Sequence, residues 1–183
     1  MKIENSFHVP AGVEQAWAII TDVPRIVSCM PGAELTGTTP EGAFKGKARM
    51  KIGPVALEFN GDAQLYDVDP KAHTMKVKAR ASDAKGRGTV ASEMSFMLSP
   101  DASRTRVDVL TDLTLTGAVA QYGRGAGLIK EVANQFTRDF AANLESLVRQ
   151  QAPAQPQKPV SGLSILFRAL RAMVARWFGG KQA

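Results

Sequence analysis

Apolar and polar residues alternate at every second position in much of this chain, a pattern that predicts β-strands with one buried and one exposed face. Residues 44–52 show it most strictly, because the even positions are apolar or glycine and the odd positions are all Lys or Arg. Turn-forming dipeptides such as Gly53-Pro54 and Ser99-Pro100 separate neighbouring segments, so we expect an antiparallel meander. The pattern predicts strands at residues 2–9, 44–52, 55–65, 74–81, 86–98 and 106–116.

Helical periodicity predicts two short helices and one long helix. The short ones, at about 13–21 and then up to Cys29, are separated by Asp22 and Pro24. Between residues 125 and 150, apolar residues recur every three or four positions, as on a helix with one core-facing side. That side holds Ile129, Val132, Phe136, Phe140, Leu144 and Leu147, flanked by Leu128 and Val148. We therefore expect an α+β helix-grip fold, in which a curved antiparallel sheet surrounds a long C-terminal helix and the short helices plug one end.

The composition changes abruptly after Gln151. Residues 152–161 contain three prolines and no hydrophobic period, which is typical of a semi-rigid linker. We predict a folded domain at 1–151, this linker, and a separate amphipathic helix at 162–178. That helix is too short and too charged to span a bilayer, but it has the apolar and basic sides of a helix lying on a membrane surface. Its predicted membrane contacts are Leu166, Phe167, Arg168, Leu170, Arg171, Met173, Val174, Arg176, Trp177 and Phe178.

The distribution of charge supports this interpretation. The chain carries 23 basic and 17 acidic residues, a formal net charge of +6. Residues 161–183 contain four basic residues and no acidic one, so the rest of the chain is close to neutral. A helix that docks on its own domain or on a partner is the alternative, but such a helix normally carries both signs of charge. Basic side chains attract anionic lipid, so we favour a membrane surface and do not expect binding to nucleic acid.

Three features bear on the compartment. The chain has no run of 18 apolar residues, and its first residues lack a basic segment followed by an apolar one, so we expect neither a transmembrane helix nor a secretory signal. The single Cys29 cannot form an internal disulfide, which fits a reducing environment. We expect a cytoplasmic protein, peripheral on the inner face of the cytoplasmic membrane.

The inward strand positions carry almost nothing that ionises. Their polar exceptions are Asn5, Ser92 and Thr111. General acid–base catalysis needs a His, Asp, Glu or Lys in the pocket, whereas His8 and His73 fall on an outward face and in a turn. No His/Cys/Asp cluster has the spacing of a metal site. We predict no catalytic residue, no metal site and no covalent cofactor.

The same inward faces predict a cavity between the sheet and the long helix. They are rich in Met and Phe, and methionine side chains adapt to pockets that must fit around a ligand. An ordinary core position is the alternative for each of these residues. The candidate ligand contacts are Phe59, Met94, Phe96, Tyr122, Leu128, Val132 and Phe136.

Several short segments together resemble one family. Residues 27–35 (VSCMPGAEL) resemble the signature that follows the short helices in the CoxG subunits of carbon monoxide dehydrogenase, which belong to the START/SRPBCC helix-grip superfamily. Further segments similar to that family are 44–55 (FKGKARMKIGPV), 59–63 (FNGDA), 86–88 (GRG) and 115–123 (LTGAVAQYG). Each segment alone is weakly diagnostic, but the combination is specific and covers about residues 1–150.

The resemblance implies the helix-grip fold and a link to molybdenum hydroxylases of the CO dehydrogenase type, whose electrons must reach membrane quinones. It implies a membrane-associated carrier or recruitment factor that connects such an enzyme to the electron-transport chain. Its apolar ligand would be a respiratory quinone, menaquinone or ubiquinone. Two alternatives stay open: a membrane adaptor with a closed core that binds no ligand, and an enzyme of the aromatase/cyclase type on the same fold.

Overall fold

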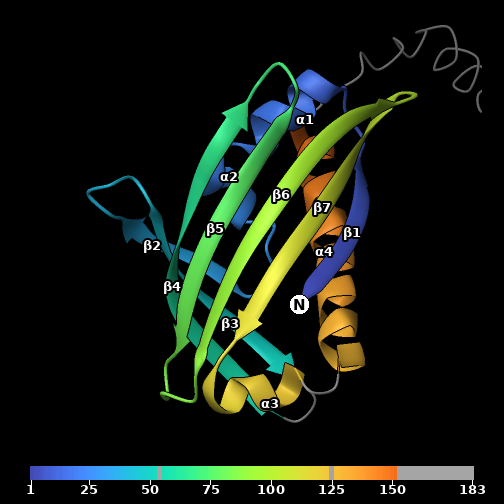
Figure 1. Cartoon of the computed structure of the whole chain (residues 1–183). Coiled ribbons are helices and arrows are strands. Elements are labelled where there is room, and N and C mark those ends of the chain that lie inside the picture. Colours follow the sequence, from blue (N-terminus) through green and yellow to red (C-terminus); the bar gives the residue numbers. More distant parts are fainter. Residues whose placement is uncertain (53–54, 124–125, 152–183) are drawn as a thin grey trace, which may run out of the picture. The chain divides into compact units, whose positions relative to one another are not determined.

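The computed structural model describes residues 1–52, 55–123 and 126–151 (Figure 1). The chain divides into two units, Met1–Gln150 and Gln151–Ala183, and the description concerns the first. The predicted linker 152–161 and amphipathic helix 162–178 lie outside the described residues and stay predictions. The elements are β1 (Lys2–Val9), α1 (Val13–Ile20), α2 (Val23–Val27), β2 (Ala33–Thr38), β3 (Phe44–Ile52), β4 (Val55–Asp69), β5 (Thr74–Asp83), β6 (Thr89–Asp101), β7 (Arg104–Leu115), the 3₁₀ turn η1 (Gly117–Val119), α3 (Ala120–Gly123) and α4 (Ala126–Gln151).

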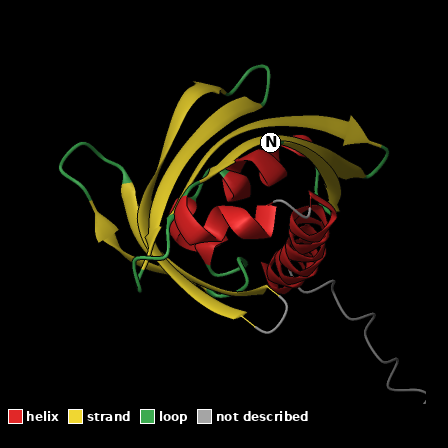
Figure 2. Cartoon of the chain, turned by 60° about the horizontal axis from the view of Figure 1, so that its bottom comes forward, coloured by secondary structure: helices red, strands yellow, loops and turns green. Residues whose placement is uncertain are grey.

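All seven strands form one antiparallel sheet in the order β1-β7-β6-β5-β4-β3-β2. Six strands follow one another as hairpins, and β1 joins the far edge by pairing with β7. The sheet curls around the helices (Figure 2), with α4 running beside β1 and with α1 and α2 inside the same concave face. This arrangement confirms the predicted α+β helix-grip fold.

Strand register explains why the predicted inward faces stay together. The pairs Ala48↔Phe59, Val77↔Met94 and Phe96↔Val109 are directly opposite one another, so apolar side chains form continuous rows across neighbouring strands. A shift of one residue would turn each row to the solvent side. The cationic side of β3 lies outside, where Arg49 donates a hydrogen bond to Glu58 at 2.9 Å.

The structure differs from the predicted strands in several places, since β4 continues to Asp69 and β6 begins only at Thr89. It adds β2, a short edge strand whose pairing with β3 shifts between Leu35 and Gly37 and whose sequence has no strict alternation. It also extends β6 through Pro100, where we predicted a turn. Pro100 is tolerated because it pairs with β7 alone, beyond the point where β5 begins at Thr74.

The buried apolar residues form two clusters. The larger one joins α1 and α2 to β1, β6, β7 and the C-terminal part of α4, and it contains Val9, Val107 and Leu144, each at 0% exposure. The smaller one lies toward α3 and centres on Leu57, Val119 and Ile129. Between them, several inward side chains are only half-buried although they face the concave side of the sheet. That partial exposure results from a cavity.

Candidate ligand-binding site

A cavity of about 440 Å³ separates α4 from the concave face of the sheet. We call it the α4 lobe, and its walls come from β1, β3 to β7, η1 and α4. Ligand pockets in proteins typically have volumes of about 300–1,000 Å³. Its inner wall includes Ile3, Met50, Val90, Met94, Leu113, Val119, Ile129, Val132, Ala133 and Phe136.

A second cavity of about 310 Å³ continues from the first toward α2. We call it the α2 lobe, and it is bounded by α2, the α2–β2 turn and strands β2 to β5. The two lobes are neighbouring compartments of one apolar space, because the same side chains line both. These shared residues are Phe7, Met30, Ala48, Phe59, Val77, Ala81, Met94, Phe96 and Phe140.

The α4 lobe is open to the surface. Two of its lining side chains, Met50 on β3 and Phe136 on α4, have exposed fractions of 36% and 39%. Large apolar side chains that are both exposed and part of a cavity wall mark its mouth, here between β3 and α4. An apolar molecule could therefore enter without unfolding of the domain.

The structure brings five of the seven predicted contacts to this space. Phe59, Met94 and Phe96 line both lobes, and Val132 and Phe136 line the α4 lobe. Their contact with a ligand stays a prediction.

The two other predicted contacts do not join this set. Leu128 is 44% exposed and is not part of either wall. It precedes the inward-facing Ile129, and one residue turns a side chain by about 100° around a helix. Tyr122 belongs to α3, but its side chain lies outside the described part of the chain.

The α2 lobe was not predicted, although the sequence contains a signal for it. Val23, Ile26, Val27 and Met30 are spaced as on one face of a helix, and all four line this lobe. We expected the short helices only to plug one end of the sheet. Their apolar side also forms the roof of the second compartment.

The interior of the cavity contains few polar groups. Asn5, Ser92 and Thr111 line the α4 lobe, as does Thr137, whose hydroxyl donates to the carbonyl of Ala133 at 2.9 Å. The Asn5 amide donates to Oδ1 of Asn134 on α4 at 2.8 Å. No Asp, Glu, His, Lys or Arg is among the described residues that line the α4 lobe. The charged residues beside the α2 lobe are exposed, as expected for outward strand positions.

A polar clamp lies near the α3 end of the α4 lobe, next to the lining residue Val119. The Asp83 carboxylate is fully buried and accepts hydrogen bonds from Nε and Nη2 of Arg87 at 2.8 and 2.7 Å. These bonds, helped by the backbone N–H groups of Arg87 and Lys85, hold the pKa of Asp83 well below its usual range. Arg87 Nη2 also donates to the carbonyl of Ala56, and the Arg87 carbonyl accepts from the N–H of Val119. The clamp thus ties the β5–β6 turn to β4 and η1.

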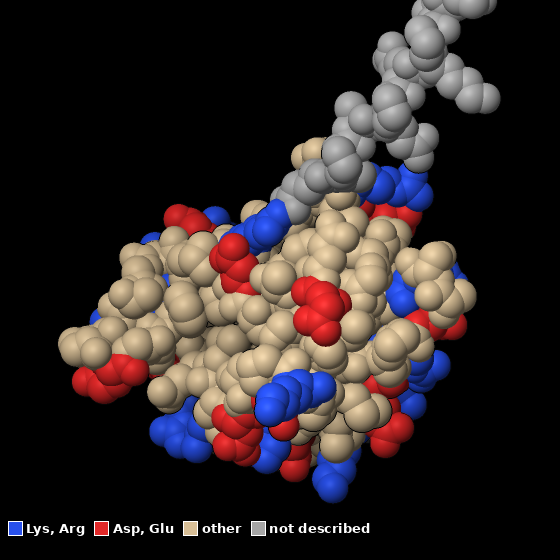
Figure 3. Space-filling view, turned by 90° about the horizontal axis from the view of Figure 1, so that it is seen from above, with Lys and Arg blue, Asp and Glu red and all other residues tan. Residues whose placement is uncertain are grey.

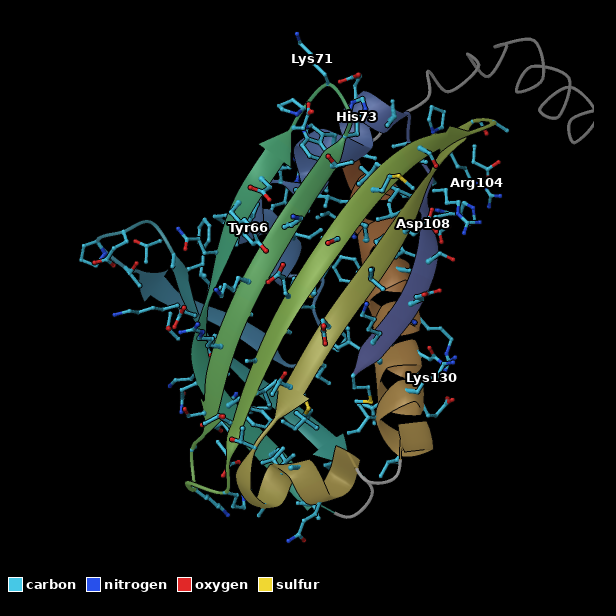
Figure 4. All side chains as sticks on the ribbon, viewed as in Figure 1. Tyr66, Lys71, His73, Arg104, Asp108 and Lys130 are labelled. Carbon is cyan, nitrogen blue, oxygen red and sulfur yellow. The ribbon has the colours of Figure 1, made fainter. Side chains whose placement is uncertain are left out.

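The two histidines lie away from the cavity. His73 sits in the β4–β5 turn above α1 (Figure 4), with Nε2 3.1 Å from Glu14 and its ring edge-on to Trp17. Nε2 of His8 on β1 is 2.9 Å from Oδ2 of Asp101, which lies at the hairpin between β6 and β7. Within the described ranges no group of three His, Cys, Asp or Glu residues could hold a metal ion.

The surface of this unit shows no concentrated charge at the end that holds α1. Basic and acidic side chains are interspersed there (Figure 3). No helix among residues 1–52, 55–123 and 126–151 is both long and apolar enough to cross a membrane.

Comparison with protein families shows to which family the chain belongs. Residues 6–149 match the family model of CoxG, a subunit of carbon monoxide dehydrogenase. The chain belongs to the CoxG family. A comparison with curated proteins gave no significant match.

Several solved structures have a fold similar to that of this chain. A conserved protein from Geobacillus kaustophilus is 20% identical, with a TM-score of 0.71 over 82% of this chain and 96% of that one. A START superfamily protein from Mycobacterium smegmatis is 17% identical, with a TM-score of 0.53 over 81% and 97%. The Zhui aromatase/cyclase from Streptomyces sp. R1128 is 13% identical, with a TM-score of 0.60 over 84% and 96%. These likenesses show the START-type helix-grip fold.

Two of the CoxG-like segments form tight corners around the cavity. Gly32 in the α2–β2 turn has φ +73°, and a Cβ there would lie 2.2 Å from the carbonyl oxygen of Arg49. Gly88 after the β5–β6 turn has φ +148°, and a Cβ there would lie 2.1 Å from the carbonyl oxygen of Thr116. Glycine is needed at both, because any side chain would collide with a neighbouring backbone. The first corner adjoins Met30 and Ala33 of the α2 lobe, and the second adjoins Val119 of the α4 lobe.

Proposed function

We propose that this protein carries an apolar ligand, a respiratory quinone such as menaquinone or ubiquinone, at the inner surface of the cytoplasmic membrane. In this role it connects a molybdenum hydroxylase of the CO dehydrogenase type to the membrane electron-transport chain. The two-lobed apolar cavity with its open mouth is the observation that carries the proposal. Membership of the CoxG family supports the choice of enzyme and of ligand.

A carrier allows a soluble enzyme to exchange electrons with a lipid-soluble quinone without exposing the quinone's tail to water. Each CH₂ group of an isoprenoid tail that leaves an apolar environment for water costs about 0.8 kcal/mol. A cup lined by Met, Phe, Val and Leu replaces the bilayer as the environment of the tail. Because the mouth lies between β3 and α4, the ligand can enter with little change of the sheet.

Extraction of the protein after purification from its own host tests the ligand. We expect mass spectrometry of the organic extract to find a quinone, and native mass spectrometry to find the corresponding added mass on the chain. The variant Val132→Trp should fold but retain less quinone, because its side chain fills the α4 lobe. Recovery of no apolar molecule from the wild-type protein, together with no binding of added quinone, would contradict the proposal.

The membrane part of the proposal rests on the sequence of residues 162–178. Deletion of 161–183 should release the protein from membranes and leave ligand binding by the domain intact. Changing Arg168, Arg171 and Arg176 to Glu should weaken binding to vesicles that contain anionic lipid more than binding to neutral vesicles. Membrane association that survives both changes would assign the anchor to another surface. Loss of ligand binding on deletion would make the tail a lid of the cavity.

An aromatase/cyclase activity is the second candidate, because the Zhui structure shares the fold. Proton transfer to a polyketide would need an ionisable side chain facing the ligand. The described walls of the α4 lobe hold none, which favours a non-catalytic binding protein. A pure adaptor without ligand is disfavoured by the volume and the open mouth of the cavity. A catalysed reaction that is lost on changing one lining residue would favour the enzyme instead.

A further inference from the structure

The α4 lobe contains two hydroxyl groups without a protein partner. Ser92 on β6 and Thr111 on β7 both line this lobe and are half-buried. Within the described part of the chain, neither side chain donates or accepts a hydrogen bond. A hydroxyl in an apolar wall that lacks a partner is costly unless water or a ligand supplies one.

These hydroxyls belong to one diagonal row on the inner face of the sheet. Ser92 is opposite Leu113, which lies two residues from Thr111, and Thr111 is opposite Ile3, which lies two residues from Asn5. Positions related in this way face the same side and lie within about 7–8 Å of each other. The row therefore offers two hydroxyl donors and, from Asn5, an amide oxygen that can accept.

The α2 lobe has no comparable groups. The described residues of its wall include no Ser, Thr, Asn, Gln, Tyr or His, and its charged residues are exposed. The polar groups of the interior therefore all lie in one compartment, while the other presents apolar side chains alone, such as Ile26 and Leu65.

From this asymmetry we infer the class and the orientation of the ligand, an inference that rests on the proposed carrier function. The ligand carries a ring-borne carbonyl or hydroxyl oxygen that binds Ser92 and Thr111 in the α4 lobe, and its apolar chain extends past Phe59 and Phe96 into the α2 lobe. Because the row both donates and accepts, it holds the same oxygen as a carbonyl or as a hydroxyl. An apolar hydrocarbon fits the cavity but leaves the hydroxyls without partners.

Two probes test the oxygen contact on the full chain. One is a naphthoquinone with a geranyl chain, and the other is the same ring and chain without the ring oxygens. The double variant Ser92→Ala and Thr111→Val removes both hydroxyls with little change of shape. The matched control, Ser95→Ala and Thr114→Val, removes two hydroxyls from the outer face of the same strands. Calorimetric titration gives each affinity.

We expect the inner double variant to bind the quinone about tenfold more weakly and the hydrocarbon within about twofold of wild type, since each hydrogen bond contributes a few-fold. The control should leave both affinities unchanged. Equal losses for both probes would show that the residues act through packing and would overturn the inference. No loss for the quinone would overturn it while leaving the apolar carrier intact. Binding of neither probe to wild type would remove the proposed function and the inference together.

A third probe tests the orientation. A diazirine at the far end of the geranyl chain, activated by light, should label peptides that contain Ile26 or Leu65. Labelling of the peptide with Val132 and Phe136 instead would place the chain in the α4 lobe and refute the proposed direction.

Discussion

The two halves of α4 have the same kind of sequence and opposite surroundings. Toward its C-terminus, Leu144 and Val148 are 0% and 4% exposed, packed in the cluster that contains Trp17, Ile19 and Ile20 from α1. Toward its N-terminus, Val132 and Phe136 follow the same three-or-four-residue spacing but line a cavity. We call these regions the packed half and the cavity half. The difference comes from α1 and α2, which occupy the concave face of the sheet beside the packed half but not beside the cavity half.

The two halves are also closed by different forces. The packed half is held by the buried apolar side chains of Leu144 and Val148. The cavity half has fewer of these. The strands near the α3 end of the α4 lobe are instead joined by the clamp of Asp83 and Arg87 and by the hydroxyl pair of Thr89 and Thr116 at 2.6 Å. A domain that must keep a void can close its end with directional polar bonds, which need little apolar filling. Stability and ligand capacity should therefore respond to different residues.

The largest loss of stability should come from Leu144→Ala. Removing a fully buried Leu side chain from a close-packed region costs about 3–5 kcal/mol, because the neighbours cannot fill the space. On the same helix, Val148→Ala should cost more than Val132→Ala, since Val132 already borders empty space. Denaturant unfolding of the three variants measures these differences. Equal costs for the two valine variants would remove the distinction between the halves.

The next largest effect should come from the clamp. Asp83→Asn leaves Arg87 without its carboxylate and should lower the melting temperature by roughly 5–10 °C. Because the pKa of Asp83 is depressed in the folded state, the clamp contributes fully above the usual carboxyl range and is lost as the pH falls through the lower folded value. The gap between wild type and variant should therefore be widest near neutral pH and close in acid, as scanning calorimetry can follow.

An exposed pair on β7 provides the control for the clamp. Asp108 accepts from Arg106 at 2.7 Å on the outer face, where solvent weakens the attraction. Asp108→Asn should leave the melting temperature almost unchanged. If it lowers the melting temperature as much as Asp83→Asn does, burial is not what makes the clamp important.

Adding volume should distinguish the halves in a third way. Ala16 on α1 is 0% exposed in the cluster that covers the packed half, so Ala16→Leu should destabilise the fold by about 1–3 kcal/mol through overpacking. Ala133→Leu adds the same atoms to the wall of the α4 lobe and should change stability by less than about 0.5 kcal/mol. Ala133→Leu should instead weaken binding of a short-chain quinone. Stability is read from denaturant unfolding and binding from calorimetry, and a severe loss of stability in Ala133→Leu would mean that the lobe is not a true void.

The comparison also explains what the sequence could predict. The alternation of apolar and polar residues at every second position identified the inward faces of the long strands, so Phe59, Met94 and Phe96 were correctly placed on the concave side. It did not reveal β2, whose Gly37 interrupts both alternation and register. Most of the candidate site followed from these faces, but the second lobe did not.

The limit on predicting the cavity is physical. Phe136 and Leu144 occupy the same stripe two turns apart, and nothing local to either residue states whether α1 will fill the space opposite. Filling depends on where the short helices end, which is a property of the whole fold. The helical spacing of Val23, Ile26 and Met30 indicates an apolar face, yet the same spacing would serve a solid core.

The smallest effect should come from two asparagines that tie α4 to the rest of the unit, one in each half. Asn134 accepts from Asn5 beside the cavity, and Asn143 donates to the Cys29 carbonyl at 3.1 Å in the packed half. Replacing either by Ala should cost about 1 kcal/mol of global stability, because each variant loses one hydrogen bond between neutral groups. Their local effects should differ. Without Asn134 the N-terminal part of α4 loses one of its few fixed contacts, so its amides should exchange hydrogen faster, whereas Leu144 and Val148 still anchor the C-terminal part when Asn143 is removed. Hydrogen exchange with mass spectrometry resolves the two parts of the helix. If the cavity half is the part of α4 that opens for a ligand, Asn134→Ala should speed exchange in that half alone, and Asn143→Ala should cause no matching change. Uniform exchange along α4 in both variants would instead show that the helix responds as one rigid body.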